Sequence, residues 1–247
     1  MNNAIRETLA AGAPSVGSWL NLGSPMAAEI MAAAGYPWLC VDAEHAPYDM
    51  ESIAHMFRAI ESRGALPLVR AWDHAPQTAA RLLDAGARGI CFPHVSNAQQ
   101  AQALGRAMRY PPRGLRSIGS GRCNALSPDY RDLADRDVLC IVQIEDMEGI
   151  EDAEAIAAVR DVDICFLGPT DLAASMGVEF GSAAHEHALQ SFREGCARGG
   201  KPSGIPTADG AATRRRIQEG FQFIDMSCDL AFLQAKAAAE LDIAMKS

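Results

Sequence analysis

Eight short apolar segments, each followed by a helix-like segment, constrain the fold of this chain more than any other feature. The helix-like segments repeatedly end at a glycine, as at Gly35, Gly64 and Gly86. Ser24 and Ser96 are predicted caps of two of them, with Pro25 at the first helical position after Ser24, and another helix is predicted at about 149–159. The predicted strands cover residues 15–20, 38–42, 66–70, 89–92, 138–144, 163–167, 201–205 and 221–226. Right-handed crossovers between eight parallel strands close naturally into a barrel. We therefore predict an α/β fold, a (β/α)8 TIM barrel, formed by a single domain over residues 1–247.

An open, doubly wound sheet is the competing arrangement. Its dinucleotide-binding form carries a Gly-x-Gly-x-x-Gly turn after an early strand, and no such turn follows residues 15–20 or 38–42. The chain has 247 residues, 49% of them hydrophobic, which is enough for one large core. This length is common for a single barrel, so the barrel is the preferred interpretation.

Charge and cysteine content limit the environment and the partners. The formal net charge is 22 − 31 = −9, which disfavours a broad surface for nucleic acid or anionic membrane. No uncharged apolar run approaches the ~20 residues that span a bilayer. The seven cysteines include no Cys-x-x-Cys pair, a pattern that fits a reducing compartment. We expect a cytoplasmic protein that binds neither nucleic acid nor a membrane.

Two acidic residues follow neighbouring predicted strands. Glu145 ends an apolar strand, and Asp171 lies just after the next one, in Gly168-Pro169-Thr170-Asp171. Carboxylates without a nearby Cys or His suit a hard divalent ion such as Mg²⁺ or Mn²⁺, with water and substrate as further ligands. Both acids also stand where helices begin, so ordinary helix caps are the simpler alternative.

A histidine and an arginine stand at two other strand ends. His45 follows Asp42 by three residues, close enough for the carboxylate to orient the imidazole as a general base. Arg70 ends the third predicted strand, where a guanidinium can stabilise an oxyanion. Each residue also has a purely structural interpretation. His45 would then be an isolated histidine without a catalytic role, and Arg70 would form a salt bridge at the rim of the barrel.

Two other segments are less specific. His185 and His187 are two residues apart and point away from each other on a helix, so we interpret them as solvated surface. Residues 110–137 form a long connection that contains Arg116 and Arg122, and a connection of this length in a compact domain is often functional.

Five motifs together resemble a known family, the HpcH/HpaI aldolases. These are class II pyruvate-dependent 2-oxo acid aldolases, and they include 4-hydroxy-2-oxoheptanedioate and 2-dehydro-3-deoxygalactarate aldolases. The motifs are DAEHAP at 42–47, Arg70, YPPRGLR at 110–116, VQIE at 142–145 and GPTDLA at 168–173. The likeness runs in order along nearly the whole chain. It implies a TIM barrel of the phosphoenolpyruvate/pyruvate-binding type, assembled as a homo-oligomer, commonly a hexamer, whose last helix (about 229–245) packs against or exchanges with a neighbouring subunit.

The resemblance assigns roles to the strand-end residues. It implies Glu145 and Asp171 as ligands of a divalent metal, Mg²⁺ or Mn²⁺ with Co²⁺ as a further candidate. Gln143 would support the metal or its water, and Arg70 would stabilise an enolate. His45, with Asp42, would be the base. The amides around Gly168, Pro169, Thr170 and Asp171 would bind the carboxylate of pyruvate.

The resemblance also concerns residues further from the metal. Asp84 matches an acid that reaches an active site near a subunit interface. The segment 117–122, Pro93-His94 and residues 205–207 differ from many relatives. These differences lie near the expected aldehyde side, where Arg116 and Arg122 are candidates. Arg122 would favour an acidic or polyhydroxylated aldehyde.

The activity implied is reversible cleavage of a 4-hydroxy-2-oxo acid to pyruvate, or a close 2-oxo acid, and an aldehyde, by way of a metal-stabilised enolate. Oxaloacetate decarboxylation is an expected side activity because it forms the same enolate. Two alternatives stay open: an acyl-CoA lyase of the malyl or citryl type, and a barrel that binds 2-oxo acids without catalysis. The sequence does not identify the aldehyde, the preferred metal or the stereochemistry.

Overall fold

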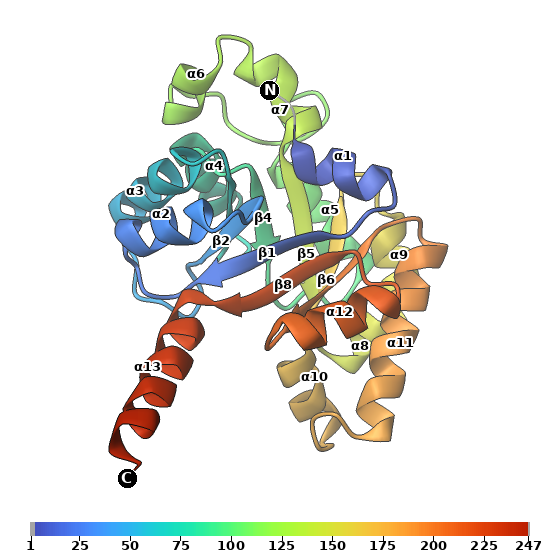
Figure 1. The fold of residues 1–247 in the computed structure, drawn as a ribbon. Coiled ribbons are helices and arrows are strands. Elements are labelled where there is room, and N and C mark those ends of the chain that lie inside the picture. The colour runs from blue at the N-terminus through green and yellow to red at the C-terminus, as the bar shows by residue number, and fades with distance from the viewer. Residues whose placement is uncertain (1–2, 247) are drawn as a thin grey trace.

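Eight parallel strands close into a barrel, which confirms the predicted fold (Figure 1). The computed structural model describes residues 3–246, without the side chain of Leu126, so residues 1, 2 and 247 of the predicted domain lie outside the description. The strands are β1 (Ser15–Leu20), β2 (Trp38–Asp42), β3 (Leu66–Arg70), β4 (Gly89–Phe92), β5 (Leu139–Ile144), β6 (Ile164–Leu167), β7 (Ser203–Thr207) and β8 (Phe223–Cys228). Parallel pairing of β8 with β1 completes the ring.

The last two strands begin later than predicted. β7 and β8 start at Ser203 and Phe223, two residues beyond the predicted starts at 201 and 221. Phe221 is buried in the core between the strands and the helices. Its apolar character therefore reflects packing before the strand, and hydrogen-bonded pairing of β7 with β8 begins only at Gly204 and Phe223.

Helices follow the strands, and all but the last, α13 (Asp229–Met245), pack on the outside of the barrel (Figure 1). They include α2 (Pro25–Ala33), α3 (Met50–Glu61), α4 (Pro76–Ala85), α5 (Ala98–Ala107), α10 (Pro169–Met176), α11 (Ala183–Arg198) and α12 (Gly210–Gln218). Ser24 caps α2, with Pro25 at the first helical position, as predicted. The predicted cap of α5 at Ser96 is wrong. Asn97 accepts the N–H of Gln100 there, whereas the Ser96 hydroxyl donates to Asp146.

Two regions between β4 and β6 differ from the sequence prediction. The helix predicted near 149–159 is divided into α8 (Met147–Glu151) and α9 (Ala153–Ala158). The break is at Asp152, whose side chain accepts the N–H of Ala98 in the adjacent helix. The long connection contains two short helices, α6 (Arg122–Leu126) and α7 (Tyr130–Asp137).

A short helix that the sequence did not predict, α1 (Ala4–Ala10), closes the amino end of the barrel. Ile5 packs among the residues that fill the barrel interior. Arg6 forms an ion pair with Asp163 at 2.7 Å, and the Asn3 side chain donates to the Asp137 carbonyl at 2.7 Å. This helix therefore covers the barrel interior at the amino ends of the strands.

Aromatic side chains fill the middle of the barrel. Trp38 stacks on Phe223 with ring centroids 4.3 Å apart, and Phe166 meets Phe223 edge to face at 6.0 Å. Trp19 stacks against Phe166 at 6.0 Å. These rings lie beneath the polar side chains at the carboxyl ends of the strands. Among residues 3–246, no helix combines the length and the apolar character that crossing a bilayer requires.

Candidate active site

A cavity of about 190 Å³ lies at the carboxyl ends of the strands. In barrels of this type, the active site is built at that end. The cavity is lined in part by Trp19, Arg70, Gln143, Asp171 and Asp225. The structure therefore brings residues from β1, β3, β5, β8 and the start of α10 to one place.

Arg70 is fixed in this cavity by two carboxylates and an aromatic ring. Its Nε and one terminal nitrogen donate to the two oxygens of Asp42 at 2.9 and 2.8 Å. The other terminal nitrogen lies 2.9 Å from Glu44 Oε2. The guanidinium carbon lies 4.3 Å from the centre of the Trp19 ring, a cation–π distance. The charge is thus held at the cavity wall with little freedom to move.

Asp42 does not orient His45 in the way the sequence suggested. Both carboxylate oxygens of Asp42 are occupied by Arg70, and one also accepts the Asn21 side chain at 2.8 Å. From His45, Asp42 accepts only the backbone N–H, at 3.4 Å. The side chain of His45 is 66% exposed. Burial alone would raise the pKa of Asp42, but the hydrogen bonds and charge of Arg70 outweigh it, so this pKa lies below its ordinary value.

Glu145 is buried and held by three donors. Gln143 Nε2 donates to Oε2 at 2.6 Å. The backbone N–H of His94 donates to Oε1 at 2.8 Å, and His94 Nδ1 lies 2.9 Å from the same oxygen. Burial raises the pKa of Glu145 despite these donors, and the negative charge of Asp171 adds to the rise. A cation at this carboxylate would offset both effects.

Gly168 permits the close approach of Glu145 to the start of α10. A Cβ at position 168 would lie 2.2 Å from Glu145 Oε2, an impossible contact. Gly168 is the N-cap of α10, Pro169 takes its first position, and Asp171 stands in its first turn. The N–H groups of Thr170 and Asp171 have no partner within the helix, so they can bind an anion beside the acidic pair.

The donor set fits a hard divalent cation. Glu145 and Asp171 offer carboxylate oxygens, and within the described part of the chain no group of three or more His, Cys, Asp or Glu side chains could hold a metal ion by itself. Mg²⁺ is commonly bound by one or two carboxylates together with water and substrate oxygens. The two acids fit that pattern, with the remaining positions left to water and substrate.

Two residues of the site carried no assigned role from the sequence. His94 was expected at the pocket, because it follows a strand end, but was given no role; it contacts Glu145 directly. Asp225 lies inside the barrel beside the cavity, and its Oδ1 is buried without a hydrogen-bond partner. Burial raises the pKa of Asp225 well above its ordinary value. The sequence signal that could have identified Asp225 was an acidic residue within an apolar strand, in Phe223-Ile224-Asp225.

His185 was predicted to be solvated surface, and this is wrong. The side chain is fully buried. Its Nδ1 accepts the N–H of Gly181 at 3.0 Å, and its Nε2 donates to the Pro169 carbonyl at 2.8 Å. α11 therefore turns this histidine toward α10, whereas His187 is exposed, as expected.

Asp84, Arg116 and Arg122 lie at the opposite end of the barrel. They gather at the last turn of α4, which runs back toward the strand starts because it follows a parallel strand. Arg116 is buried, 2.7 Å from Asp84, and Arg122 pairs with Glu61. The predicted aldehyde-side positions of Arg116 and Arg122 are therefore wrong for the cavity of their own chain, since helix direction carries both residues away from it.

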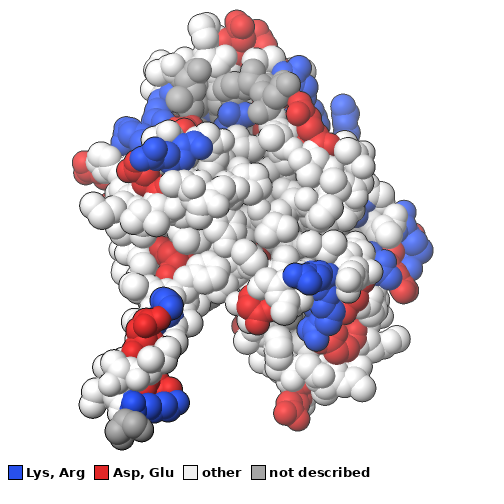
Figure 2. All heavy atoms as spheres, viewed as in Figure 1, with Lys and Arg blue, Asp and Glu red and all other residues white. Residues whose placement is uncertain are grey.

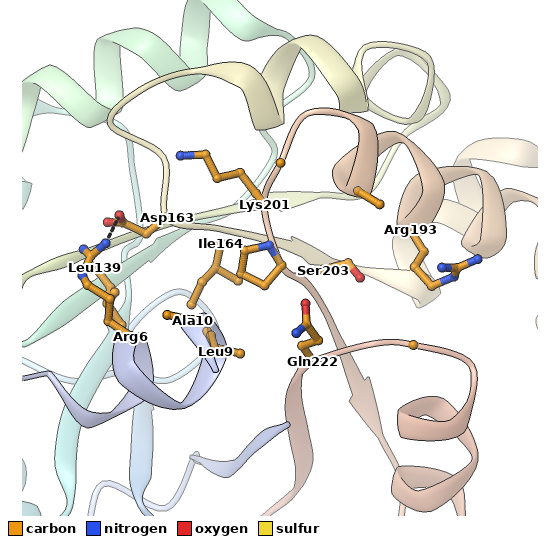
Figure 3. A pocket seen from close by; sticks show the side chains of 14 residues that line it. Arg6, Leu9, Ala10, Leu139, Asp163, Ile164, Arg193, Lys201, Ser203 and Gln222 are labelled. Carbon is orange, nitrogen blue, oxygen red and sulfur yellow. Dashed lines mark hydrogen bonds and ion pairs between the residues drawn. The ribbon is translucent and has the colours of Figure 1, made fainter. Parts of the chain in front are cut away.

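A larger cavity, of about 440 Å³, also lies at the strand starts (Figure 3). It is bordered by α1 and by the first residues of β5, β6 and β7, including Ser203. Arg6 points toward Asp163 there, while Arg193 and Lys201 extend to different sides. The acidic pair and Arg70 are absent from its lining, so chemistry, rather than cavity size, places the candidate active site at the other end.

Comparison with known proteins finds relatives along nearly the whole chain. Residues 15–235 match the family model described as HpcH/HpaI aldolase/citrate lyase. A hydroxypyruvate/pyruvate aldolase from Cupriavidus necator is 39% identical over 97% of this chain and 91% of that protein. A 4-hydroxy-2-oxo-heptane-1,7-dioate aldolase from Klebsiella pneumoniae is 36% identical over 97% of this chain and 92% of its own length.

A solved structure gives the same result for the fold. The crystal structure of an HpcH/HpaI aldolase/citrate lyase family protein from Burkholderia cenocepacia has a TM-score of 0.95 and 35% identity, and the match covers 99% of this chain and 100% of that one. The barrel and its relatives define the class, a TIM-barrel carbon–carbon lyase. The chain belongs to the HpcH/HpaI aldolase/citrate lyase family.

Proposed function

We propose that this chain is a divalent-metal-dependent aldolase that cleaves a 4-hydroxy-2-oxo acid to pyruvate, or a close 2-oxo acid such as hydroxypyruvate, and an aldehyde. One observation carries the proposal. Asp171, Gln143 and Arg70 line one cavity, and Gln143 donates to the buried Glu145. The names of the relatives from Cupriavidus necator and Klebsiella pneumoniae support a 2-oxo acid substrate.

In this proposal, Glu145 and Asp171 hold Mg²⁺ or Mn²⁺, with Co²⁺ as a further candidate. When bound, the metal supplies a Lewis acid that polarises the keto group of the substrate. The first-turn amides of Thr170 and Asp171 take the substrate carboxylate at the start of α10. Gly168 and Pro169 shape that turn.

Arg70 stabilises the negative charge that develops on the C2 keto oxygen when the C3–C4 bond is cleaved and its electron pair forms the enolate. Its position is fixed by Asp42 and Trp19 before the reaction, so no reorganisation is needed as the charge forms. His45 serves as the base, its exposed ring lying beside Glu44. It accepts the C4 hydroxyl proton in cleavage and a methyl proton of pyruvate in the reverse direction. Asp42 acts by positioning Arg70. Decarboxylation of oxaloacetate leaves the same enolate and is the expected side activity.

The proposal extends to the assembly and the location. A homo-oligomer, commonly a hexamer in this family, would cover the exposed α13 and could bring Asp84 of one subunit toward the active site of another. Seven free cysteines support a reducing compartment such as the cytoplasm.

The test is deuterium exchange into the methyl group of pyruvate, followed by NMR in D₂O. We expect exchange with Mg²⁺ or Mn²⁺ present and none after EDTA, because loss of a methyl proton forms the enolate without any aldehyde. Asp171→Ala should stay folded and lose the exchange. Exchange that is indifferent to EDTA, or no exchange with Mg²⁺, Mn²⁺ or Co²⁺, would overturn the proposal and favour a thioester lyase or a barrel that only binds 2-oxo acids.

A further inference from the structure

His94 has a backbone conformation that is unusual for its residue type. Its φ is +53°, in the left-handed region that glycine adopts freely and that costs free energy for a residue with a Cβ. Left-handed residues other than glycine persist where surrounding contacts determine them, and they are frequent at functional sites. His94 lies in the turn after β4, beside the acidic pair.

This conformation directs two donors from one residue to the same carboxylate oxygen. The backbone N–H of His94 lies 2.8 Å from Glu145 Oε1, and its ring Nδ1 lies 2.9 Å from the same atom. Because the carboxylate oxygen is an acceptor, Nδ1 carries the hydrogen in this contact. With Gln143 on the other oxygen, both oxygens of Glu145 are held.

The other ring nitrogen extends the contact toward Arg70. His94 Nε2 lies 3.4 Å from Glu44 Oε1, and the second oxygen of Glu44 lies 2.9 Å from Arg70. The His94 side chain is nevertheless 63% exposed, so burial in the core does not account for its orientation. The ring therefore lies between the carboxylates of Glu145 and Glu44, and Glu44 contacts Arg70.

We propose that His94 is a positioning residue for the metal ligand Glu145: its ring and backbone N–H together fix the carboxylate for metal binding. The inference rests on the proposed function, since it assigns Glu145 to the metal. Groups that hydrogen-bond to a metal-binding carboxylate orient it, and their removal typically weakens metal binding by about 10- to 100-fold.

Two substitutions separate the ring from the backbone. His94→Gly relieves the backbone conformation and keeps the N–H donor to Glu145, but it removes the ring. His94→Asn places an amide nitrogen where Nδ1 stands, and asparagine tolerates the left-handed region better than most residues. Glu44 loses its ring partner in both variants, so the difference between them isolates the Nδ1 contact. His187→Asn is the matched control, because His187 is an exposed histidine on α11.

The experiment measures Mn²⁺ affinity by titration calorimetry, together with the metal-free melting temperature of each variant. We expect His94→Gly to weaken Mn²⁺ binding by about 10-fold or more without a lower melting temperature, and His94→Asn and His187→Asn to bind nearly as the unmodified protein does. If His94→Gly binds Mn²⁺ as tightly as the unmodified protein does, the positioning role of His94 is overturned and the proposed function is not. If the unmodified protein binds neither Mn²⁺ nor Mg²⁺, the metal-dependent function fails, and this inference fails with it.

Discussion

Arg70 shows how strongly a single side chain can be restricted before any substrate arrives. Two carboxylates and the Trp19 ring hold its guanidinium, and its side chain is only 11% exposed. Bidentate pairing with Asp42 sets the plane of the group as well as its location. A lysine could not reproduce either property.

At this scale we predict that Arg70→Ala lowers kcat by an amount equivalent to about 2–4 kcal/mol, as for other oxyanion donors. The variant should also be less stable, because the buried Asp42 loses its partner. Steady-state kinetics with a 4-hydroxy-2-oxo acid and denaturant unfolding would measure the two effects. Arg63→Ala is the control, since its pair with Glu29 is exposed and should contribute little. An unchanged kcat in Arg70→Ala would contradict the assigned role.

The start of α10 is the element on which substrate binding depends. It carries Gly168, the first-turn amides and Asp171. Its position is set by another element, because His185 of α11 donates to the Pro169 carbonyl and accepts from Gly181. The histidine therefore joins the start of α10 to the turn that precedes α11.

We predict that His185→Ala destabilises the protein by about 1–3 kcal/mol, because the buried Pro169 carbonyl and the N–H of Gly181 lose their partner. It should also raise the Kd for Mn²⁺, since the turn that carries Asp171 is no longer anchored. Urea unfolding and metal titration would show both effects. His187→Ala, an exposed position on the same helix, should match the unmodified protein. A destabilised His185→Ala with unaltered metal affinity would restrict the histidine to a purely structural role.

For the whole molecule, α13 is the element that the single chain leaves unsupported. Figure 2 shows it standing apart from the rest of the surface, and of its 17 residues only Asp229 is buried. Leu233, Leu241 and Ile243 are each more than half exposed. An isolated helix of this length is marginal in water, so a second subunit that covers its apolar side chains would account for its stability.

We predict that the protein sediments as an oligomer and that the double substitution Leu233→Lys with Leu241→Lys shifts it to smaller species, because charges would enter an apolar interface. Analytical ultracentrifugation measures the outcome. Lys236→Ala, on the same helix with an exposed side chain, should leave the mass unaltered. A double variant with the mass of the unmodified protein would show that α13 is not part of the interface.

The barrel and most of the candidate site followed from local sequence patterns. Strand and helix periodicity, with glycine at helix ends, predicted eight strands within two residues of their observed starts. Arg70, Gln143, Glu145 and Asp171 were candidates because they stand at strand ends, and parallel strands bring all such ends to one face. The family resemblance then assigned them roles that the pattern alone had left open. These inferences needed only the order of residues along the chain.

Tertiary packing decided the rest, since it depends on which side chains meet across the barrel. Asp42 pairs with Arg70, its neighbour across β2 and β3, rather than with the nearby ring of His45. Helix direction carries Arg116 and Arg122 to the far end of the barrel, and helix rotation buries His185 while it exposes His187. The contact of His94 with Glu145 joins β4 to β5 across 51 residues of sequence. Local periodicity sets the elements, but only the closed barrel fixes these pairings.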